Sequence, residues 1–520
     1  MVELPEVLNL ATVFLDHNLD AGRGARTALI CGERRVSYAE VAAETNRVGN
    51  LFRSWGLYPE QRVLLMLPDV PEFASAWFAT VKVGGVAAAV NPEQKPEEAE
   101  YYLNYTRARI CVAHASALPS IAAVKDRLPF LEHLLVVGTS NPDLGGATRF
   151  AVHLFEREVP HASAGLAPFP THRDDPAVWL FTSGSTGFPK GAVHKAHDFL
   201  YNARLFALPI LQYDEHTVSL SVPKLAFGYA LGTNLLFPFL VGATCVLVPE
   251  KPKPEAMFAA IDRHRPTMLT AVPTALNAMV NHPGIRDVDF SSLKTTISAG
   301  EALPAELYTR WKELTGVEIL DGIGSAEMFH IFITNRHGDV KLGSLGRVVE
   351  GYEAKICDDE GRELPPGEVG TLWIRGDSMA LEYWHQHEAS KRTFRGDWCV
   401  SADKFRRDEA GYFYFCGRGD DLLKVGGKWV SPLEIENVLL RHDAVQEAAV
   451  VGFKDEAGLE KPRAVVVLKP GRAADEALGR ELAEFVAGQL DWNRAPRRVD
   501  FVDALPKSDR GKVLRSALRS

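Results

Sequence analysis

The sequence predicts an α/β protein with a large N-terminal domain of parallel-rich sheets flanked by helices, a β-rich subdomain within it, and a small α+β C-terminal domain. Apolar runs of strand length alternate with helical patterns up to about Gly343, which is typical of parallel sheets covered by helices. Short strands punctuated by glycine and proline follow Gly343. A compact α+β pattern begins near Gly419, so we place the two domains at residues 1–419 and 420–520.

The first part of the chain shows the alternation clearly. Val41–Trp55 has the apolar spacing of a helix, and Arg62–Leu67 has the composition of a strand. Pro71–Val83 is helical again, and Gly84–Val90 is the next strand candidate. This order predicts βα units in a mainly parallel sheet.

The later elements follow the same reasoning. The predicted strands are 177–181, 192–194, 267–272, 295–300, 353–356, 371–375, 448–451 and 464–468. The predicted helices are 197–206, 432–440 and 477–490. No internal repeat or low-complexity tract interrupts them.

Composition limits the possible functions. A net charge of −9 and a pI near 6.0 argue against a nucleic-acid partner, because such a protein needs a basic face. The six cysteines are scattered, without a CxxC pair or zinc spacing, which predicts a reducing, cytoplasmic location. Residues 1–20 carry four acidic residues and no basic leader, so no ordinary secretory signal is expected there.

Leu225–Pro249 contains no charged residue and is long enough to cross a membrane. Gly228, Gly232, Pro238 and Gly242 interrupt it, and it ends in a β-like run. We therefore predict a buried helix followed by a core strand, and no membrane span.

A loop rich in glycine and hydroxyl groups lies between two predicted strands. It runs through Thr182, Ser183, Gly184, Ser185, Thr186 and Gly187 to Lys190. Glycines allow backbone N–H groups to approach anionic oxygens, hydroxyls donate further hydrogen bonds, and lysine adds a positive charge. Pro189 before Lys190 does not fit a Walker A loop. The loop predicts a nucleotide site, with a plain Gly/Ser linker as the alternative.

Six further stretches have compositions that suit a nucleotide enzyme. They are 298–304 (SAGEALP), 321–327 (DGIGSAE), 400–403 (VSAD), 416–421 (CGRGDD), 424–428 (KVGGK) and 506–512 (PKSDRGK). Together with the loop, and in this order, they resemble the motifs of the adenylate-forming superfamily of acyl-CoA synthetases, carrier-loading adenylation domains and luciferases. The resemblance covers nearly the whole chain and is closest to the benzoate-CoA ligase group of aryl-CoA ligases.

The resemblance implies a set of ATP-binding residues. The loop from Thr182 to Gly187 and Lys190 would hold the phosphates, and Glu327 would bind Mg²⁺, which prefers carboxylate oxygen. The residues expected at the adenine are Ala299, Gly300, Glu301, Asp321, Gly322 and Ile323, and those at the ribose are Asp403 and Arg418. Ala326 replaces the usual threonine, and Ser401-Ala402 replaces the usual Thr-Gly.

The resemblance also implies a mobile C-terminal domain. Asp420 would be its hinge, Gly426 and Gly427 would line the pantetheine tunnel of coenzyme A, and Lys512 would be the catalytic lysine. Lys512, Lys190 and Glu327 are thus the expected catalytic residues, and residues 1–419 the adenylation domain. ATP, Mg²⁺ and coenzyme A are the expected cofactors.

The expected substrate is an aromatic carboxylic acid of the benzoate type, with Ala226, Phe227, Tyr229 and His330 bordering its ring. The implied reaction forms an acyl-AMP with release of pyrophosphate and then transfers the acyl group to CoA. The ring substituent, 2-amino or hydroxy among others, and the oligomeric state stay open, with a homodimer among the choices. Core aromatics with one satisfied histidine are the structural alternative for this pocket.

Two other functions fit the same motifs. An adenylation enzyme that loads an aryl group onto a carrier-protein pantetheine shares all of them. A nucleotide-binding scaffold without catalysis is suggested by Ala326 and Ala402, although Lys190, Glu327 and Lys512 argue against it.

Overall fold

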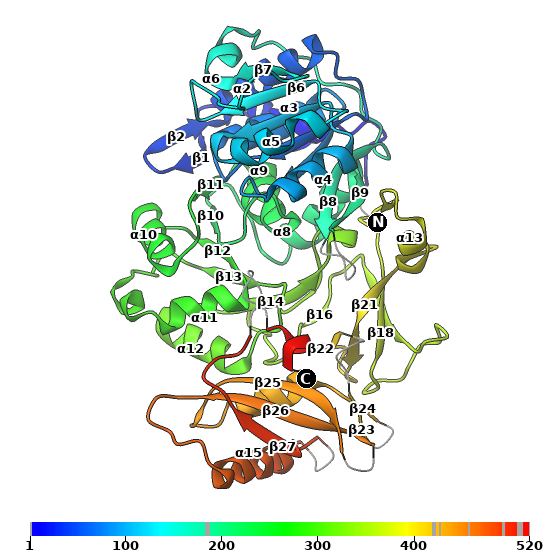
Figure 1. Ribbon diagram of the computed structural model, residues 1–520. Coiled ribbons are helices and arrows are strands. Elements are labelled where there is room, and N and C mark those ends of the chain that lie inside the picture. The colour runs from blue at the N-terminus through cyan, green and yellow to red at the C-terminus, as the bar shows by residue number, and fades with distance from the viewer. Residues whose placement is uncertain are drawn as a thin grey trace.

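The computed structural model describes residues 3–182, 188–418, 423–425, 428–455, 458–490, 494–506 and 513–518. Within these ranges the predicted fold class is confirmed. The structure contains two large parallel-rich sheets, an antiparallel β-rich sheet and a small α+β unit. In Figure 1 the α+β unit, coloured orange to red, lies at one end of the molecule.

The first sheet has eight strands in the order β19-β9-β8-β4-β3-β5-β6-β7. Its strands are β3 (Arg62–Met66), β4 (Val86–Val90), β5 (Ile110–His114), β6 (His133–Val137), β7 (Ala151–Leu154), β8 (Pro176–Thr182), β9 (Lys190–Lys195) and β19 (Glu382–Tyr383). The strands from β8 to β7 are parallel, and β9 and β19 extend the sheet in antiparallel fashion. Its helices are α2 (Tyr38–Ser54), α3 (Pro71–Lys82), α4 (Pro96–Thr106), α5 (Leu118–Val124) and α6 (Phe155–Glu158).

Each face of this sheet has its own core. Val63 and Leu65 of β3 pack with α2 and α3, whereas Leu64 and Met66 pack with α4 and α5. Both faces are buried because successive side chains of a strand point to opposite sides. This explains why the strand sequences are apolar runs rather than alternating patterns.

The second sheet has nine strands in the order β16-β15-β14-β13-β12-β10-β11-β1-β2. They are β1 (Thr27–Cys31), β2 (Arg34–Ser37), β10 (Val218–Ser221), β11 (Thr244–Leu247), β12 (Met268–Ala271), β13 (Thr295–Ser298), β14 (Ile319–Gly324), β15 (Ile331–Thr334) and β16 (Arg347–Val348). One face is covered by α10 (Pro254–His264), α11 (Pro273–Asn281) and α12 (Ala305–Thr315). The early strand β1 joins this sheet beside β11, with Leu29 opposite Cys245.

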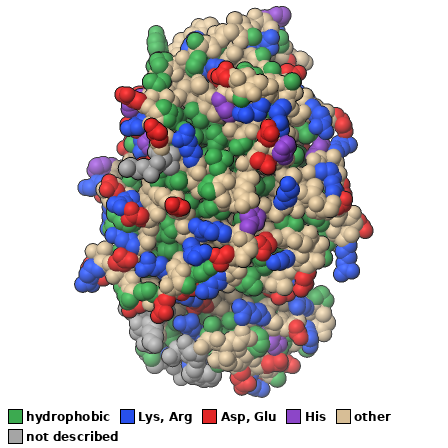
Figure 2. Space-filling view, turned by 180° about the vertical axis from the view of Figure 1, so that it is seen from behind, with side chains coloured by type: hydrophobic (Ala, Val, Ile, Leu, Met, Phe, Trp, Pro, Cys, Tyr) green, Lys and Arg blue, Asp and Glu red, His purple; other side chains and the backbone are tan. Residues whose placement is uncertain are grey.

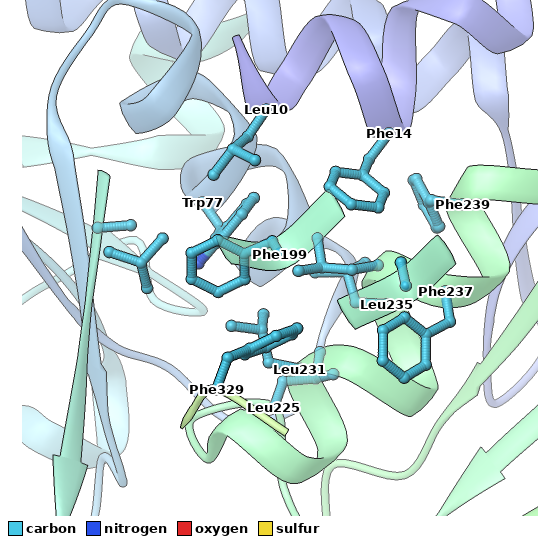
Figure 3. Close-up of a cluster of buried hydrophobic side chains, with 14 of the residues drawn as sticks. Leu10, Phe14, Trp77, Phe199, Leu225, Leu231, Leu235, Phe237, Phe239 and Phe329 are labelled. Carbon is cyan, nitrogen blue, oxygen red and sulfur yellow. The ribbon is translucent and has the colours of Figure 1, made fainter. Parts of the chain in front are cut away.

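A large apolar core fills the space between the two sheets. It includes side chains of α7 (Ala196–Asn202), α8 (Gly228–Leu231), α9 (Phe237–Val241), and of turns that precede α1 (His17–Asp20). Figure 3 shows Phe14, Trp77, Phe199, Phe239 and Phe329 pointing into one cluster. Phe199 and Phe329 have ring centroids 4.3 Å apart, so the segment that carries Glu327 is anchored in this core.

The remaining elements are shorter. The β-rich sheet contains β17 (Glu353–Cys357), β18 (Gly370–Arg375), β20 (Phe394–Arg395), β21 (Trp398–Arg407) and β22 (Phe413–Arg418), with α13 (His387–Thr393) beside it. The C-terminal unit contains β23 (Leu423–Val425), β24 (Lys428–Val430), α14 (Pro432–Leu439), β25 (Val445–Lys454), β26 (Glu460–Leu468), α15 (Glu476–Gln489) and β27 (Arg498–Phe501). The predicted helices 432–440 and 477–490 are therefore confirmed within one residue.

In the uncharged segment 225–249, α8, a π-helical turn at Gly232–Leu236 and α9 form one continuous helical run, which strand β11 follows. The predicted buried helix and core strand are therefore confirmed, with a π-helical turn inside the helix. The predicted helix 197–206 is likewise confirmed as one continuous run, in which α7 passes into a π-helical turn at Ala203–Ala207. No helix among the described residues is both long and apolar enough to cross a membrane. Basic and acidic side chains are interspersed over the face shown in Figure 2.

Candidate active site

A cleft of about 720 Å³ lies where the first sheet, the second sheet and the β-rich sheet meet. Six of the predicted site residues line it, and they come from separate parts of the chain: Thr182, Lys190, Gly300, Ile323, Glu327 and Asp403. The three positions that depart from the motifs, Ala326, Ser401 and Ala402, also line this cleft. The fold thus brings the predicted phosphate, adenine, metal and ribose segments to one place.

The ends of the glycine-rich loop are fixed at the cleft. Thr182 at the end of β8 is paired with Lys190 at the start of β9, in an antiparallel register. The loop therefore leaves the sheet and returns to it at adjacent positions, both on the cleft wall. Ser183, Gly184, Ser185, Thr186 and Gly187 lie outside the described residues.

Glu327 and Lys190 are connected through Tyr383, which also lines the cleft. The Tyr383 hydroxyl donates a hydrogen bond to Glu327 Oε1 at 2.5 Å. Lys190 Nζ lies 4.1 Å from the centroid of the same ring, a cation–π distance. Burial, followed by the nearby Glu327 carboxylate, raises the pKa of Tyr383, so its hydroxyl is a donor at neutral pH.

Sequence reasoning missed Tyr383. Its position depends on the two-residue strand β19, in which Tyr383 is paired with Ala192 of β9. A strand of two residues gives no periodic signal, so the sequence offers no pattern that identifies it.

Asp403 and Arg418, the two predicted ribose residues, are opposite each other in the register of β21 and β22. Asp403 lies on the cleft wall with Ser401, whose hydroxyl accepts a hydrogen bond from the Asp403 N–H at 3.0 Å. The strand pairing therefore places both backbones beside the cleft. The side chain of Arg418 lies outside the described part of the structure.

The predicted adenine residues lie at the ends of neighbouring strands β13 and β14. Gly300 has φ +88°, a conformation that favours glycine, and it borders the cleft. Ala299 is buried, and Glu301 accepts hydrogen bonds from the Thr274 hydroxyl at 2.6 Å and its N–H at 3.2 Å. Backbone groups of this turn thus face the cleft, while the Glu301 carboxylate is held by α11.

Asp321 has a different environment from Gly322 and Ile323. It is buried in a small cavity beside α12, away from the main cleft wall. Burial raises its pKa from 3.8 to about 8, so this carboxyl is mostly protonated at pH 7. Gly322 has no room for a side chain, because a Cβ there would lie 2.6 Å from the Ile333 carbonyl oxygen.

The four residues predicted to border an aryl ring lie on two segments. Ala226 and Phe227 directly precede α8, where Phe227 is 45% exposed. Tyr229 and His330 are in contact: the His330 Nε2 lies 3.0 Å from the Tyr229 carbonyl oxygen, and the rings are 5.5 Å apart. His330 is also packed against Phe206 and Phe237.

The protonation state of His330 follows from these contacts. Burial lowers its pKa to about 4, so the ring is neutral at pH 7. A carbonyl oxygen only accepts, so Nε2 carries the hydrogen and donates it to Tyr229. Nδ1 is then an acceptor, and it has no hydrogen-bond partner among the described residues.

Lys512, the hinge residue Asp420, and Gly426 and Gly427 all lie outside the described residues, as does the loop 183–187. Their roles stay predictions.

Comparison with known proteins identifies the family to which this chain is similar. The family pattern for AMP-binding enzymes matches residues 16–384, and that for the AMP-binding enzyme C-terminal domain matches residues 434–512. The chain is 42% identical to a benzoate–CoA ligase of Thauera aromatica over 521 residues, which cover 100% of this chain and 97% of the relative.

Solved structures give the same picture. One is the crystal structure of an anthranilate CoA ligase, AuaEII, in complex with anthranoyl-AMP. It matches this chain with a TM-score of 0.91 and 40% identity, and the match covers 99% of this chain and 97% of that one. Another is a benzoate CoA ligase from Burkholderia xenovorans LB400, with a TM-score of 0.86, 38% identity, and coverage of 98% and 100%. The resemblance noticed in the sequence thus extends over the full fold.

Proposed function

The chain belongs to the AMP-binding enzyme family, and we propose that it is an ATP-dependent aryl-CoA ligase acting on a benzoate-type acid. It would join the acid to AMP with release of pyrophosphate and then transfer the acyl group to the thiol of coenzyme A. One observation carries the proposal: segments from Thr182 to Asp403 that match nucleotide motifs converge on a single cleft. The full-length similarity to benzoate- and anthranilate-CoA ligases supports the choice of acid.

The first half-reaction needs positive charge near the phosphates. A carboxylate is a poor electrophile, and joining it to AMP gives the carbonyl carbon a good leaving group. Lys190 lies on the cleft wall, where its ammonium would offset charge on the departing pyrophosphate. Lys512 would do the same at the α-phosphate, so the protein would act by positioning and electrostatics without a covalent intermediate.

Glu327 fits a magnesium ion. Mg²⁺ is commonly held by one or two protein carboxylates and takes its other ligands from phosphates and water. Glu327 faces the cleft, and the described residues contain no cluster of three or more acidic, histidine or cysteine side chains that could hold a metal alone. When bound there, Mg²⁺ would neutralise phosphate charge and orient the leaving pyrophosphate.

The acid would lie near Tyr229 and His330, with Ala226 and Phe227 at the entrance. His330 Nδ1 is a buried acceptor without a described partner, and such an atom costs free energy until a donor reaches it. We therefore propose that acids with a hydrogen-bond donor on the ring, such as 2-aminobenzoate or a hydroxybenzoate, bind at least as well as benzoate.

The second half-reaction would use the C-terminal domain, residues 420–520. A rotation about Asp420 would remove Lys512 and let the thiol of coenzyme A reach the acyl carbon along Gly426 and Gly427.

All six cysteines are free, among residues that the structure describes, which supports a reducing cytoplasmic location.

The decisive experiment measures pyrophosphate release with ATP and Mg²⁺. The acids would be benzoate, aminobenzoates, hydroxybenzoates, cyclohexane carboxylate and a fatty acid, each with and without CoA. We expect release with one or more aryl acids and an aryl-CoA product. Release without a thioester would favour the carrier-loading alternative, and no release with any acid would contradict the proposal and favour the scaffold.

A further inference from the structure

Beside the cleft lies a histidine–carboxylate pair that the proposed reaction does not use. His194 is in β9, and Asp198 is in the first turn of α7. Both side chains are completely buried, and His194 Nδ1 lies 2.8 Å from Asp198 Oδ2. The other ring nitrogen, Nε2, lies 2.6 Å from the backbone oxygen of Ala326. The imidazole therefore bridges α7 and the segment that contains Glu327.

The direction of these hydrogen bonds is fixed by chemistry. A backbone carbonyl can only accept, so Nε2 carries a hydrogen and donates it to Ala326. A carboxylate opposite the second nitrogen fixes the orientation of the ring, as it does for histidines that act on a metal site. Asp198 is itself held, because its Oδ2 accepts the backbone N–H of Lys195 at 3.1 Å.

Residues 326–329, which His194 contacts through Ala326, include a strained backbone position that other contacts must stabilise. Phe329 has φ +66°, an unfavourable conformation for a bulky residue. Two other groups bind neighbouring backbone carbonyls: the Ala380 N–H donates to the Glu327 carbonyl oxygen at 2.8 Å, and the Ser378 hydroxyl donates to the Met328 carbonyl oxygen at 2.9 Å. His194 provides the corresponding bond to Ala326, next to the Glu327 carboxylate.

His194 also links this segment to the phosphate side of the cleft. It lies on β9, the strand that begins with Lys190. Glu327 and Lys190 meet through Tyr383 on the cleft side, and through His194 behind it. The distance between the proposed metal ligand and the proposed phosphate lysine is thus set from both sides.

We propose that His194, oriented by Asp198, is a positioning residue that holds Glu327 at the correct distance from Lys190 for Mg·ATP. This inference rests on the proposed function, because it assigns the metal to Glu327. It names a buried residue, outside the cleft wall, as a determinant of the magnesium requirement. It does not involve the aryl acid or coenzyme A.

Two isosteric variants separate the two hydrogen bonds. The amide nitrogen of glutamine reaches as far as histidine Nε2, so His194→Gln keeps the donor to Ala326. The amide nitrogen of asparagine matches Nδ1, so His194→Asn keeps the contact with Asp198 and loses the one with Ala326. Asp198→Asn is a third variant, in which an amide oxygen in the Oδ2 position still accepts the Lys195 N–H and Nε2 still donates to Ala326.

The readout is the Mg²⁺ concentration that gives half-maximal pyrophosphate release, with the KM of the acid and the unfolding temperature measured in parallel. We expect His194→Asn to raise the Mg²⁺ requirement by about 10–100-fold, the usual effect of losing an outer-shell partner. His194→Gln and Asp198→Asn should change it by less than about threefold. The KM of the acid, and thioester formation from a preformed aryl-AMP and CoA, should be unchanged in all three.

Other results overturn the inference. The inference fails if the His194→Asn and His194→Gln variants have equal Mg²⁺ requirements. It also fails if the Mg²⁺ requirement changes only in proportion to the loss in unfolding temperature, because His194 would then act only in the packing of the core. Calorimetry of ATP binding with and without Mg²⁺ makes the test independent of the acid. If the wild type binds Mg·ATP but releases no pyrophosphate with any acid, the proposed function fails, and the variants still report on His194.

Discussion

Replacing Gly232 with alanine tests whether the packing around His330 controls the binding of the acid. A Cβ at Gly232 would lie 2.5 Å from Cδ2 and 2.8 Å from Nε2 of His330, and 3.0 Å from Cζ of Phe237. These distances are shorter than side chains tolerate, so the imidazole must move. It has little room, because Phe206, Phe237 and Tyr229 surround it.

The cost can be estimated from two contributions. Overpacking a full core costs about 1–3 kcal/mol. Moving the ring breaks the 3.0 Å hydrogen bond from His330 Nε2 to the Tyr229 carbonyl, and a buried polar group left unpaired costs about 1–3 kcal/mol. We expect Gly232→Ala to lose about 2–6 kcal/mol of folding free energy on this basis. If half of that loss disturbs the bound acid, about 1–3 kcal/mol, its KM rises by about 5–100-fold, since 1.4 kcal/mol corresponds to a factor of about ten.

The assay compares the KM of the aryl acid and of ATP in pyrophosphate release, with the unfolding temperature of each protein. The matched control is Gly488→Ala in α15, where a Cβ would meet no atom within 4 Å. That variant should gain about 0.5–1 kcal/mol from helix propensity and keep both KM values. An unchanged KM for the acid and an unchanged unfolding temperature in Gly232→Ala would refute the reasoning.

Three further predictions concern Glu327, Tyr383 and Asp69. Glu327→Gln should raise the Mg²⁺ concentration needed for pyrophosphate release by about 10–100-fold while the KM of the acid stays constant; an unchanged Mg²⁺ dependence would show that the metal is held elsewhere. Tyr383→Phe removes the hydroxyl that bonds to Glu327 and keeps the ring, and it should raise the KM for Mg·ATP about tenfold. Tyr383→Leu also removes the ring that contacts Lys190 and should raise this KM further; equal effects of the two variants would argue against the cation–π contact. Asp69 is fully buried, and burial raises its pKa from 3.8 to about 6. The folded protein therefore binds this proton more tightly than the unfolded chain does. The stability that the protonated carboxyl contributes is present below pH 3.8 and is lost as the pH rises through 6. Asp69→Asn should therefore gain up to about 3 kcal/mol relative to the wild type between pH 4 and pH 7, and a gap in unfolding temperature that does not change with pH would contradict this.

The elements that the sequence predicted well carry their own signals. The strands around the glycine-rich loop are apolar runs broken by glycine and proline, and they became β8 and β9 with the predicted loop between them. Two helices of the first sheet, α2 and α3, were predicted within a few residues, because their apolar spacing is regular. The order of the motifs predicted that Lys190, Glu327 and Asp403 belong to one nucleotide site, and all three residues line the same cleft.

Other features depend on contacts that no local pattern records. The β1–β2 hairpin was not predicted, because β2 is short and exposes Arg34 and Arg35. Tyr383 and His194 act through partners far along the chain; the bond from His194 to Ala326 spans 132 positions. Such residues are recognised only when the fold brings the two segments together.

The pairing of β1 with β11 has a consequence for synthesis of the chain. Leu29 lies opposite Cys245, so β1 leaves the ribosome more than 200 residues before its parallel neighbour. At roughly 5–20 residues per second, this interval lasts about 10–40 seconds. β2 covers one edge of β1 early, whereas the other edge stays unpaired, and an unpaired apolar edge is a template for wrong association. The nascent first half of this protein is therefore a natural client for chaperones until the second sheet is made.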